Sequence, residues 1–205
     1  MRFQSTLLVF GLLFLSADVV PSSARAAGCK QENVKKFFKQ KDKWCSTEYA
    51  KNISAMTDQN ILFRKGASAA ALNLAKHDNG YYLVLTTTTR GAGDHTVRAE
   101  KDPLVLKFGD GTEASLRVDA DTSSRRISMG TSEGFCGFYN ITKEQLESVQ
   151  TKKVVEISQY LDMEKDKSGP RLEKKDDGRT LYRWPLKLDK NQEELADHAA
   201  CVLSF

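Results

Sequence analysis

Apolar and polar residues alternate along two short runs in the middle of the chain, over residues 104–108 and 114–118, with a Gly-Asp-Gly turn between them. This pattern predicts a β-hairpin with one buried face. A slip of one residue would turn every side chain to the other face, so we expect burial to decide the register. We therefore predict that Phe108 pairs with Ala114 and Leu106 pairs with Leu116.

A second hairpin is predicted around Asn79-Gly80, a dipeptide that is typical of two-residue hairpin turns. Apolar residues flank it over 72–77 and 81–89. A turn centred on this dipeptide sets Leu74 opposite Leu85 and Leu72 opposite Thr87.

Helical patterns lie near both ends of the chain and once in its middle. A Lys-rich stretch at 30–52 carries an interrupted apolar stripe, and Thr142-Lys-Glu-Gln145 is a capping box that opens a short helix. From about Asn191 a terminal helix places Leu195, Ala199 and Val202 at helical spacing. The fold class that follows is α+β: an antiparallel β-sheet with an N-terminal helical segment, one short mid-chain helix and a C-terminal helix. A sandwich-like arrangement of the strands is the alternative.

The first 26 residues have the pattern of a secretory signal peptide. Arg2 is followed by an apolar run at 6–15 and by Ala24-Arg-Ala26, a small-x-small cleavage site. The run is shorter than the roughly 18 to 20 residues that span a bilayer, so we expect no transmembrane span after signal removal. The predicted organisation is a signal peptide (1–26), a basic helical segment (27–58) that packs on the main domain, and a β-rich domain with the C-terminal helix (59–205).

The predicted location is outside the cytosol, in the periplasm or the extracellular space. Lipoprotein anchoring through Cys29 is a minor alternative. Cys29, Cys45, Cys136 and Cys201 all follow the signal, and an even number of cysteines in an exported chain indicates two disulfides. Three pairings are open, and we favour Cys29–Cys45 with Cys136–Cys201. The local pair requires that the chain between its cysteines bends.

The positive charge is concentrated at one end of the mature chain. The whole sequence carries a net charge of +4, and residues 27–51 alone hold seven lysines against three acidic residues. This local distribution does not indicate a nucleic-acid-binding domain. It favours contact with another protein of acidic character or with an anionic envelope component. The candidate partner surface consists of Lys35, Lys36, Lys39, Lys41 and Lys43.

Motifs for catalysis, cofactors and metals are weak in this sequence. The chain has no Gly-x-Ser-x-Gly elbow and no Gly-rich phosphate loop, and its three histidines have no metal-ligand spacing. Asp119-Ala-Asp121 lacks the remaining ligands of a calcium loop. We therefore expect no cofactor. Asn52-Ile-Ser and Asn140-Ile-Thr match the N-glycan acceptor pattern.

The function that these observations favour is binding. We expect an exported, disulfide-stabilised accessory or inhibitor protein, because no convergent set of titratable residues can be assembled from the sequence. The alternative is a hydrolase acting on an envelope or extracellular polymer, with His95 and either Asp94 or Asp119 brought together by the fold. A purely structural envelope component is a third possibility.

Overall fold

The structure of the protein is a computed structural model, which describes residues 28–41, 44–58, 61–65, 68–90, 95–127, 132–163, 172–174, 180–184 and 191–205. The predicted signal peptide, Lys43 and Asp94 lie outside these residues. Within them the chain is an α+β protein with a mostly antiparallel β-sheet, an N-terminal helix and a C-terminal helix, as the sequence predicts.

The described residues form three α-helices and one 3₁₀ helix in addition to the strands. They are α1 (Gln31–Lys41), η1 (Thr47–Lys51), α2 (Lys143–Thr151) and α3 (Gln192–Leu203). The strands are β1 (Cys29–Lys30), β2 (Ile53–Thr57), β3 (Ile61–Lys65), β4 (Ser68–His77), β5 (Gly80–Arg90), β6 (His95–Val97), β7 (Leu104–Phe108), β8 (Glu113–Val118), β9 (Thr122–Ser123), β10 (Arg125–Arg126), β11 (Ser132–Ile141), β12 (Val154–Met163), β13 (Leu172–Lys174) and β14 (Thr180–Trp184).

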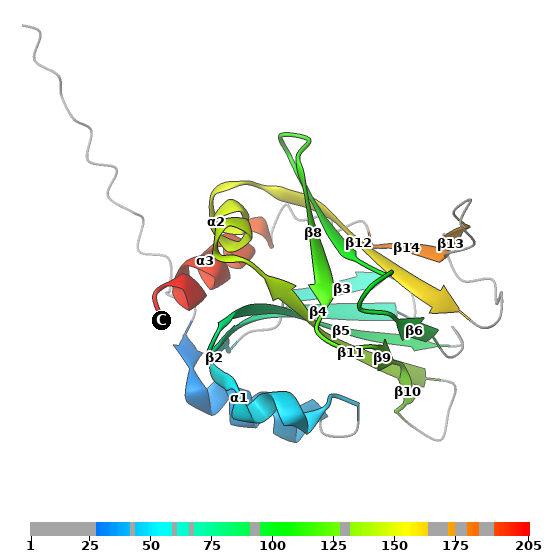
Figure 1. Cartoon of the computed structure of the whole chain (residues 1–205), viewed down its shortest axis with the longest axis horizontal. Coiled ribbons are helices and arrows are strands. Elements are labelled where there is room, and N and C mark those ends of the chain that lie inside the picture. Colours follow the sequence, from blue (N-terminus) through cyan, green and yellow to red (C-terminus); the bar gives the residue numbers. More distant parts are fainter. Residues whose placement is uncertain are drawn as a thin grey trace, which may run out of the picture.

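The strands form one bent sheet with the order β1-β2-β4-β5-β11-β8-β7-β12-β14-β13 (Figure 1). β8 joins its two halves, because residues 113–116 pair with β7 while Arg117 and Val118 pair with β11. The two halves stack as in a sandwich, yet they remain hydrogen-bonded to each other through this strand.

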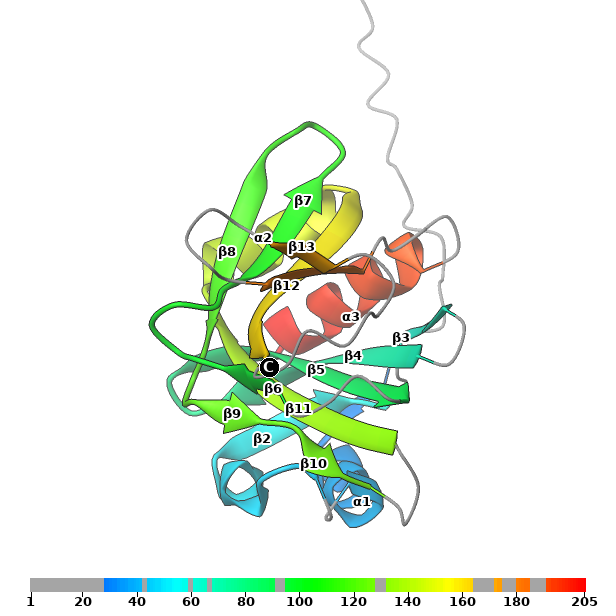
Figure 2. The same cartoon turned by 90° about the vertical axis from the view of Figure 1, so that its right-hand side faces the viewer.

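Two hydrophobic clusters pack on opposite faces of the β2-β4-β5-β11 half. The inner cluster lies between this half, β7, β8 and β12, and α2 and α3, and it contains Leu72, Leu106 and Leu146. The outer cluster lies between the same half and α1, and it contains Phe38 and Phe138. Figure 2 shows this layering, with α3 between the two halves of the sheet and α1 on the far side of β2.

The register of the β4–β5 hairpin differs from the prediction by two residues. Leu74 lies opposite Leu83, and Leu72 lies opposite Leu85. His77 pairs with Gly80, so the turn consists of Asp78 and Asn79. A two-residue shift keeps every side chain on its face, and it replaces the predicted leucine–threonine pair with leucine–leucine pairs in the core. The buried apolar pairs therefore outweigh the local preference of Asn-Gly for the turn.

The β7–β8 hairpin is shifted in the same way. Leu106 pairs with Ala114 and Leu104 pairs with Leu116, so the predicted faces are correct and the predicted pairs are wrong. Phe108 is the last residue of β7, and its N–H closes the turn by donating to the Thr112 carbonyl at 2.9 Å. Gly111 adopts a φ of 84° there, a backbone conformation that glycine reaches at little cost.

The disulfides join Cys29 to Cys201 and Cys45 to Cys136, so the favoured pairing is wrong. The eleven residues of α1 lie between Cys29 and Cys45 and extend about 16 Å. Such a helix keeps the two cysteines too far apart for a bridge, which needs Cα atoms about 4.4–6.8 Å apart. Cys29 instead lies in β1 beside α3, and its Cα is 6.0 Å from that of Cys201.

The two other predicted helix features are confirmed. The Thr142 side chain accepts the Gln145 N–H at 3.2 Å, and the Gln145 side chain accepts the Thr142 N–H at 3.0 Å, which completes the capping box of α2. In α3 the predicted apolar positions, Leu195, Ala199 and Val202, are all buried.

Candidate functional site

The basic helix α1 is held firmly on the outer face of the sheet. Val34, Phe37 and Phe38 are its buried residues. The Phe38 ring stacks on Phe138 of β11 with a centroid distance of 6.0 Å, and the Cys45–Cys136 disulfide ties the segment after the helix to the same strand. Apolar contacts and a covalent bond therefore fix the orientation of α1.

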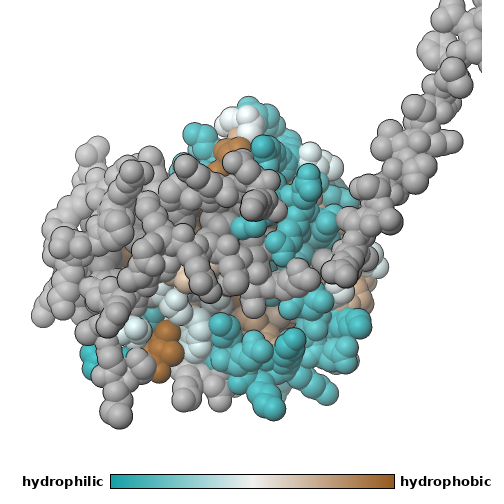
Figure 3. Space-filling view, turned by 180° about the vertical axis from the view of Figure 1, so that it is seen from behind, coloured by the Kyte–Doolittle hydropathy of each residue, from teal (hydrophilic) through white to brown (hydrophobic). Residues whose placement is uncertain are grey.

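Three of the lysines of α1 lie on the side of the helix opposite its buried residues. Lys35, Lys36 and Lys39 are exposed, and their spacing of three and four residues places them together on one helical face. None of the three forms an ion pair with a described residue. Seen from behind, the region around α1 at the lower right is mainly hydrophilic (Figure 3).

Of the other two lysines of the candidate partner surface, Lys41 alone is described. Lys43 lies outside the described residues. The Lys41 ammonium lies 4.6 Å from the centroid of the Trp44 ring, a cation–π contact, and burial lowers its pKa. We therefore define the basic face as Lys35, Lys36 and Lys39.

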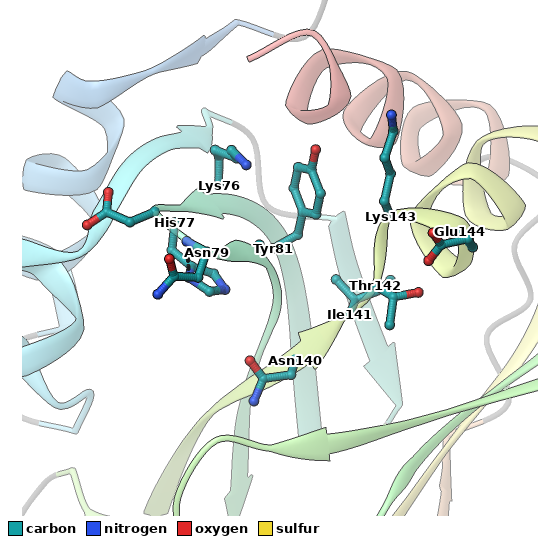
Figure 4. A pocket seen from close by; sticks show the side chains of 11 residues that line it. Lys76, His77, Asn79, Tyr81, Asn140, Ile141, Thr142, Lys143 and Glu144 are labelled. Atoms are coloured by element: carbon teal, nitrogen blue, oxygen red, sulfur yellow. Dashed lines mark hydrogen bonds between the residues drawn. The ribbon is translucent and has the colours of Figure 1, made fainter.

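A groove of about 550 Å³ lies where the β4–β5 turn approaches the start of α2 (Figure 4). Its lining residues come from the turn, from the end of β11 and from the first residues of α2; they are Lys76, His77, Asp78, Asn79, Gly80, Tyr81, Asn140, Ile141, Thr142, Lys143 and Glu144. Sequence reasoning missed this groove, because the hairpin and the helix that form it are more than 60 residues apart and nothing local links them.

An acidic and aromatic cluster lies next to the groove and was also missed. The Asp119 carboxylate accepts a hydrogen bond from the Asn140 amide at 2.9 Å. Burial and then Asp119 raise the pKa of both Tyr49 and Tyr82. The His77 ring stacks on Tyr82 with a centroid distance of 4.2 Å, and burial lowers its pKa. The rings pack directly on one another and on Phe138, so we interpret the cluster as structural.

Of the residues of the hydrolase alternative, His95 and Asp119 do not lie together, and Asp94 lies outside the described residues. His95 is buried and its ring lies 5.6 Å from that of Phe135, which belongs to the inner cluster. Asp119 instead neighbours Tyr49 and Tyr82 on the outer side of the sheet. The structure therefore places the histidine and the carboxylate on opposite faces.

The third histidine has an unusual environment. His198 is fully buried in α3, and neither ring nitrogen has a hydrogen-bond partner among the described residues. Burial lowers its pKa, while the nearby carboxylates of Asp58 and Asp197 act in the opposite direction. The two N-glycan acceptor asparagines, Asn52 and Asn140, are both exposed.

The described residues hold no further candidate of the metal-binding or membrane-spanning kind. Within the described part of the chain, no three His, Cys, Asp or Glu side chains are grouped as metal ligands would be. None of the described helices has the length and apolar character needed to cross a membrane. No protein-family model, curated protein or solved structure matches this chain.

Proposed function

We propose that this protein is an exported, disulfide-stabilised binding protein that uses the basic face of α1 to contact an acidic protein partner. The observation that carries the proposal is the basic face itself. Its three lysines, Lys35, Lys36 and Lys39, are exposed and free of ion pairs with described residues, and they lie on a helix that a buried aromatic layer holds in place.

Two physical arguments support this surface over the other charged regions. A lysine that is already paired must lose that partner before it can bind another acid, and these three have no ion-pair partner among the described residues. A helix that is fixed before binding also loses less conformational entropy on binding than a loose segment does. The two disulfides support the export part of the proposal, because structural disulfides persist in oxidising compartments.

The test measures retention of the purified protein on immobilised poly-L-glutamate, a probe for an acidic protein segment. Each exposed ion pair contributes about 0.2–1 kcal/mol. Replacing Lys35, Lys36 and Lys39 with serine should therefore weaken binding by about 0.6–3 kcal/mol, or roughly three- to 160-fold in Kd at low salt. The weakening should shrink as salt is added.

A matched control replaces Lys51, Lys107 and Lys153 with serine. These lysines are exposed, and the change in net charge is identical. If both triple variants weaken binding equally, only net charge matters and the proposed surface is wrong. An unchanged affinity of the Lys35/Lys36/Lys39 variant would refute it as well.

A further inference from the structure

The groove between the β4–β5 turn and α2 carries hydrogen-bond donors along one wall. Lys76 and Tyr81 face each other across the β4–β5 pair, and Tyr81 in turn lies opposite Ile141 of β11. Lys143 follows two residues later, in the first turn of α2. In Figure 4 the Tyr81 ring stands between the Lys76 and Lys143 side chains, so two ammonium groups flank one phenol.

These three donors are not consumed by interactions within the described protein. The Lys76 ammonium lies over the Tyr81 ring at 4.4 Å from its centroid, a cation–π contact that orients the ammonium. An ammonium has three N–H donors, so donors remain for a ligand. Lys143 reaches Glu147 only at 3.9 Å, with both side chains more than half exposed. The Tyr81 hydroxyl has no hydrogen-bond partner among the described residues.

The acidic group at the start of α2 is already satisfied locally. Hydrogen bonds from its own backbone N–H and from the Thr142 side chain lower the pKa of Glu144, so its carboxylate is held by the first turn of the helix. The capping box occupies the Gln145 N–H as well. On this wall the groups without a hydrogen-bond partner among the described residues are Lys76, Tyr81 and Lys143, all of them donors. The other carboxylate of the lining, Asp78, belongs to the β4–β5 turn beside His77.

We propose that this groove is a binding site for a small organic anion, a carboxylate or a phosphate monoester. Its volume of about 550 Å³ lies in the range of small-molecule sites. Two ammonium groups and one phenol O–H supply the charge and the hydrogen bonds that such an anion accepts. Asn140 and Ile141 on the lining would contact the uncharged part of the ligand.

The test is an NMR titration of ¹⁵N-labelled full-length mature protein with three probes: benzoate, phenyl phosphate and the uncharged benzamide. We expect benzoate or phenyl phosphate to shift the amides of Gly80, Tyr81 and Ile141, and the stronger of the two identifies the class of anion. Benzamide should shift them little. The double variant K76Q/K143Q should weaken binding of the preferred anion at least tenfold.

Two further variants keep the test decisive. K107Q/K153Q has the same charge change at exposed lysines that do not line the groove and should bind like the unmodified protein. Y81F keeps the ring and should weaken binding two- to fivefold, while K76R/K143R keeps both charges and should bind nearly as well as the unmodified protein. The proposal is wrong if neither anion shifts these amides, if benzamide shifts them equally, or if K76Q/K143Q binds unchanged. The site shares no residue with the basic face of α1, so either proposal can fail without the other.

Discussion

The disulfide pairing gives the most direct test of the tertiary structure. Replacing Cys45 and Cys136 with alanine removes a crosslink between residues 91 apart in sequence. In the chain-entropy model, a crosslink that closes a loop of this length raises the free energy of the unfolded chain by about 4.6 kcal/mol at 25 °C. Both cysteines are buried in the outer cluster, so the variant also loses apolar contacts there.

The expected result is a loss of about 4–5 kcal/mol in the free energy of unfolding, measured by urea denaturation with far-ultraviolet circular dichroism. Because domains of this kind are stable by about 5–15 kcal/mol, the variant should remain folded only weakly or not at all. The Cys29→Ala/Cys201→Ala variant is the matched comparison. Its bridge spans 172 residues, but the remaining Cys45–Cys136 bridge shortens the loop that it closes to about 81 residues, so the expected loss, about 4.5 kcal/mol, is similar.

Variants that lack one cysteine show which cysteines are paired. In Cys45→Ala, alkylation of the denatured protein followed by peptide mapping should modify Cys136 and leave Cys29 and Cys201 joined. Modification of Cys29 in this variant would show that the local Cys29–Cys45 bridge forms, and the structural account of α1 would then be wrong.

Three further predictions concern the helices and the outer cluster. Thr142→Ala removes the cap of α2 and should cost about 1 kcal/mol in urea unfolding, whereas Thr142→Ser should be nearly neutral; equal losses would contradict the capping role. Phe138→Ala empties a buried position whose ring stacks on Tyr49 at 4.0 Å and should cost about 3–5 kcal/mol, against a smaller loss for Phe138→Leu. Burial lowers the pKa of His198, so the folded protein binds this proton less readily than the unfolded chain does. The neutral His198 imidazole contributes its full share of the free energy of unfolding above a pH of about 6.5. This contribution is lost as the pH falls toward the lowered pKa of the folded state. His198→Leu should therefore flatten the loss of stability below that pH, and an unchanged pH profile would show that this imidazole is not responsible.

Features that depend on neighbouring residues could be predicted from the sequence. The capping box at Thr142 needs only residues within one helical turn, so its pattern determines the start of α2. The face of each strand side chain follows from alternation, so the inward positions of Leu72 and Leu106 were predicted correctly. The Lys-rich side of α1 also follows from the sequence, because helical spacing places Lys35 and Lys39 on a different side of the helix from Phe37 and Phe38.

Features that depend on distant residues were decided only in the folded protein. Alternation repeats every two residues, so it cannot distinguish a hairpin register from one shifted by two, and packing in the core made that choice in both hairpins. The cysteine count predicts two bridges but not their partners, which the position of β1 beside α3 determines. Lys76, Tyr81 and Lys143 meet at one groove only because β5 pairs with β11, and α2 begins where that strand ends. Local patterns assign each residue to a face, whereas contacts between segments far apart in the chain decide which faces meet.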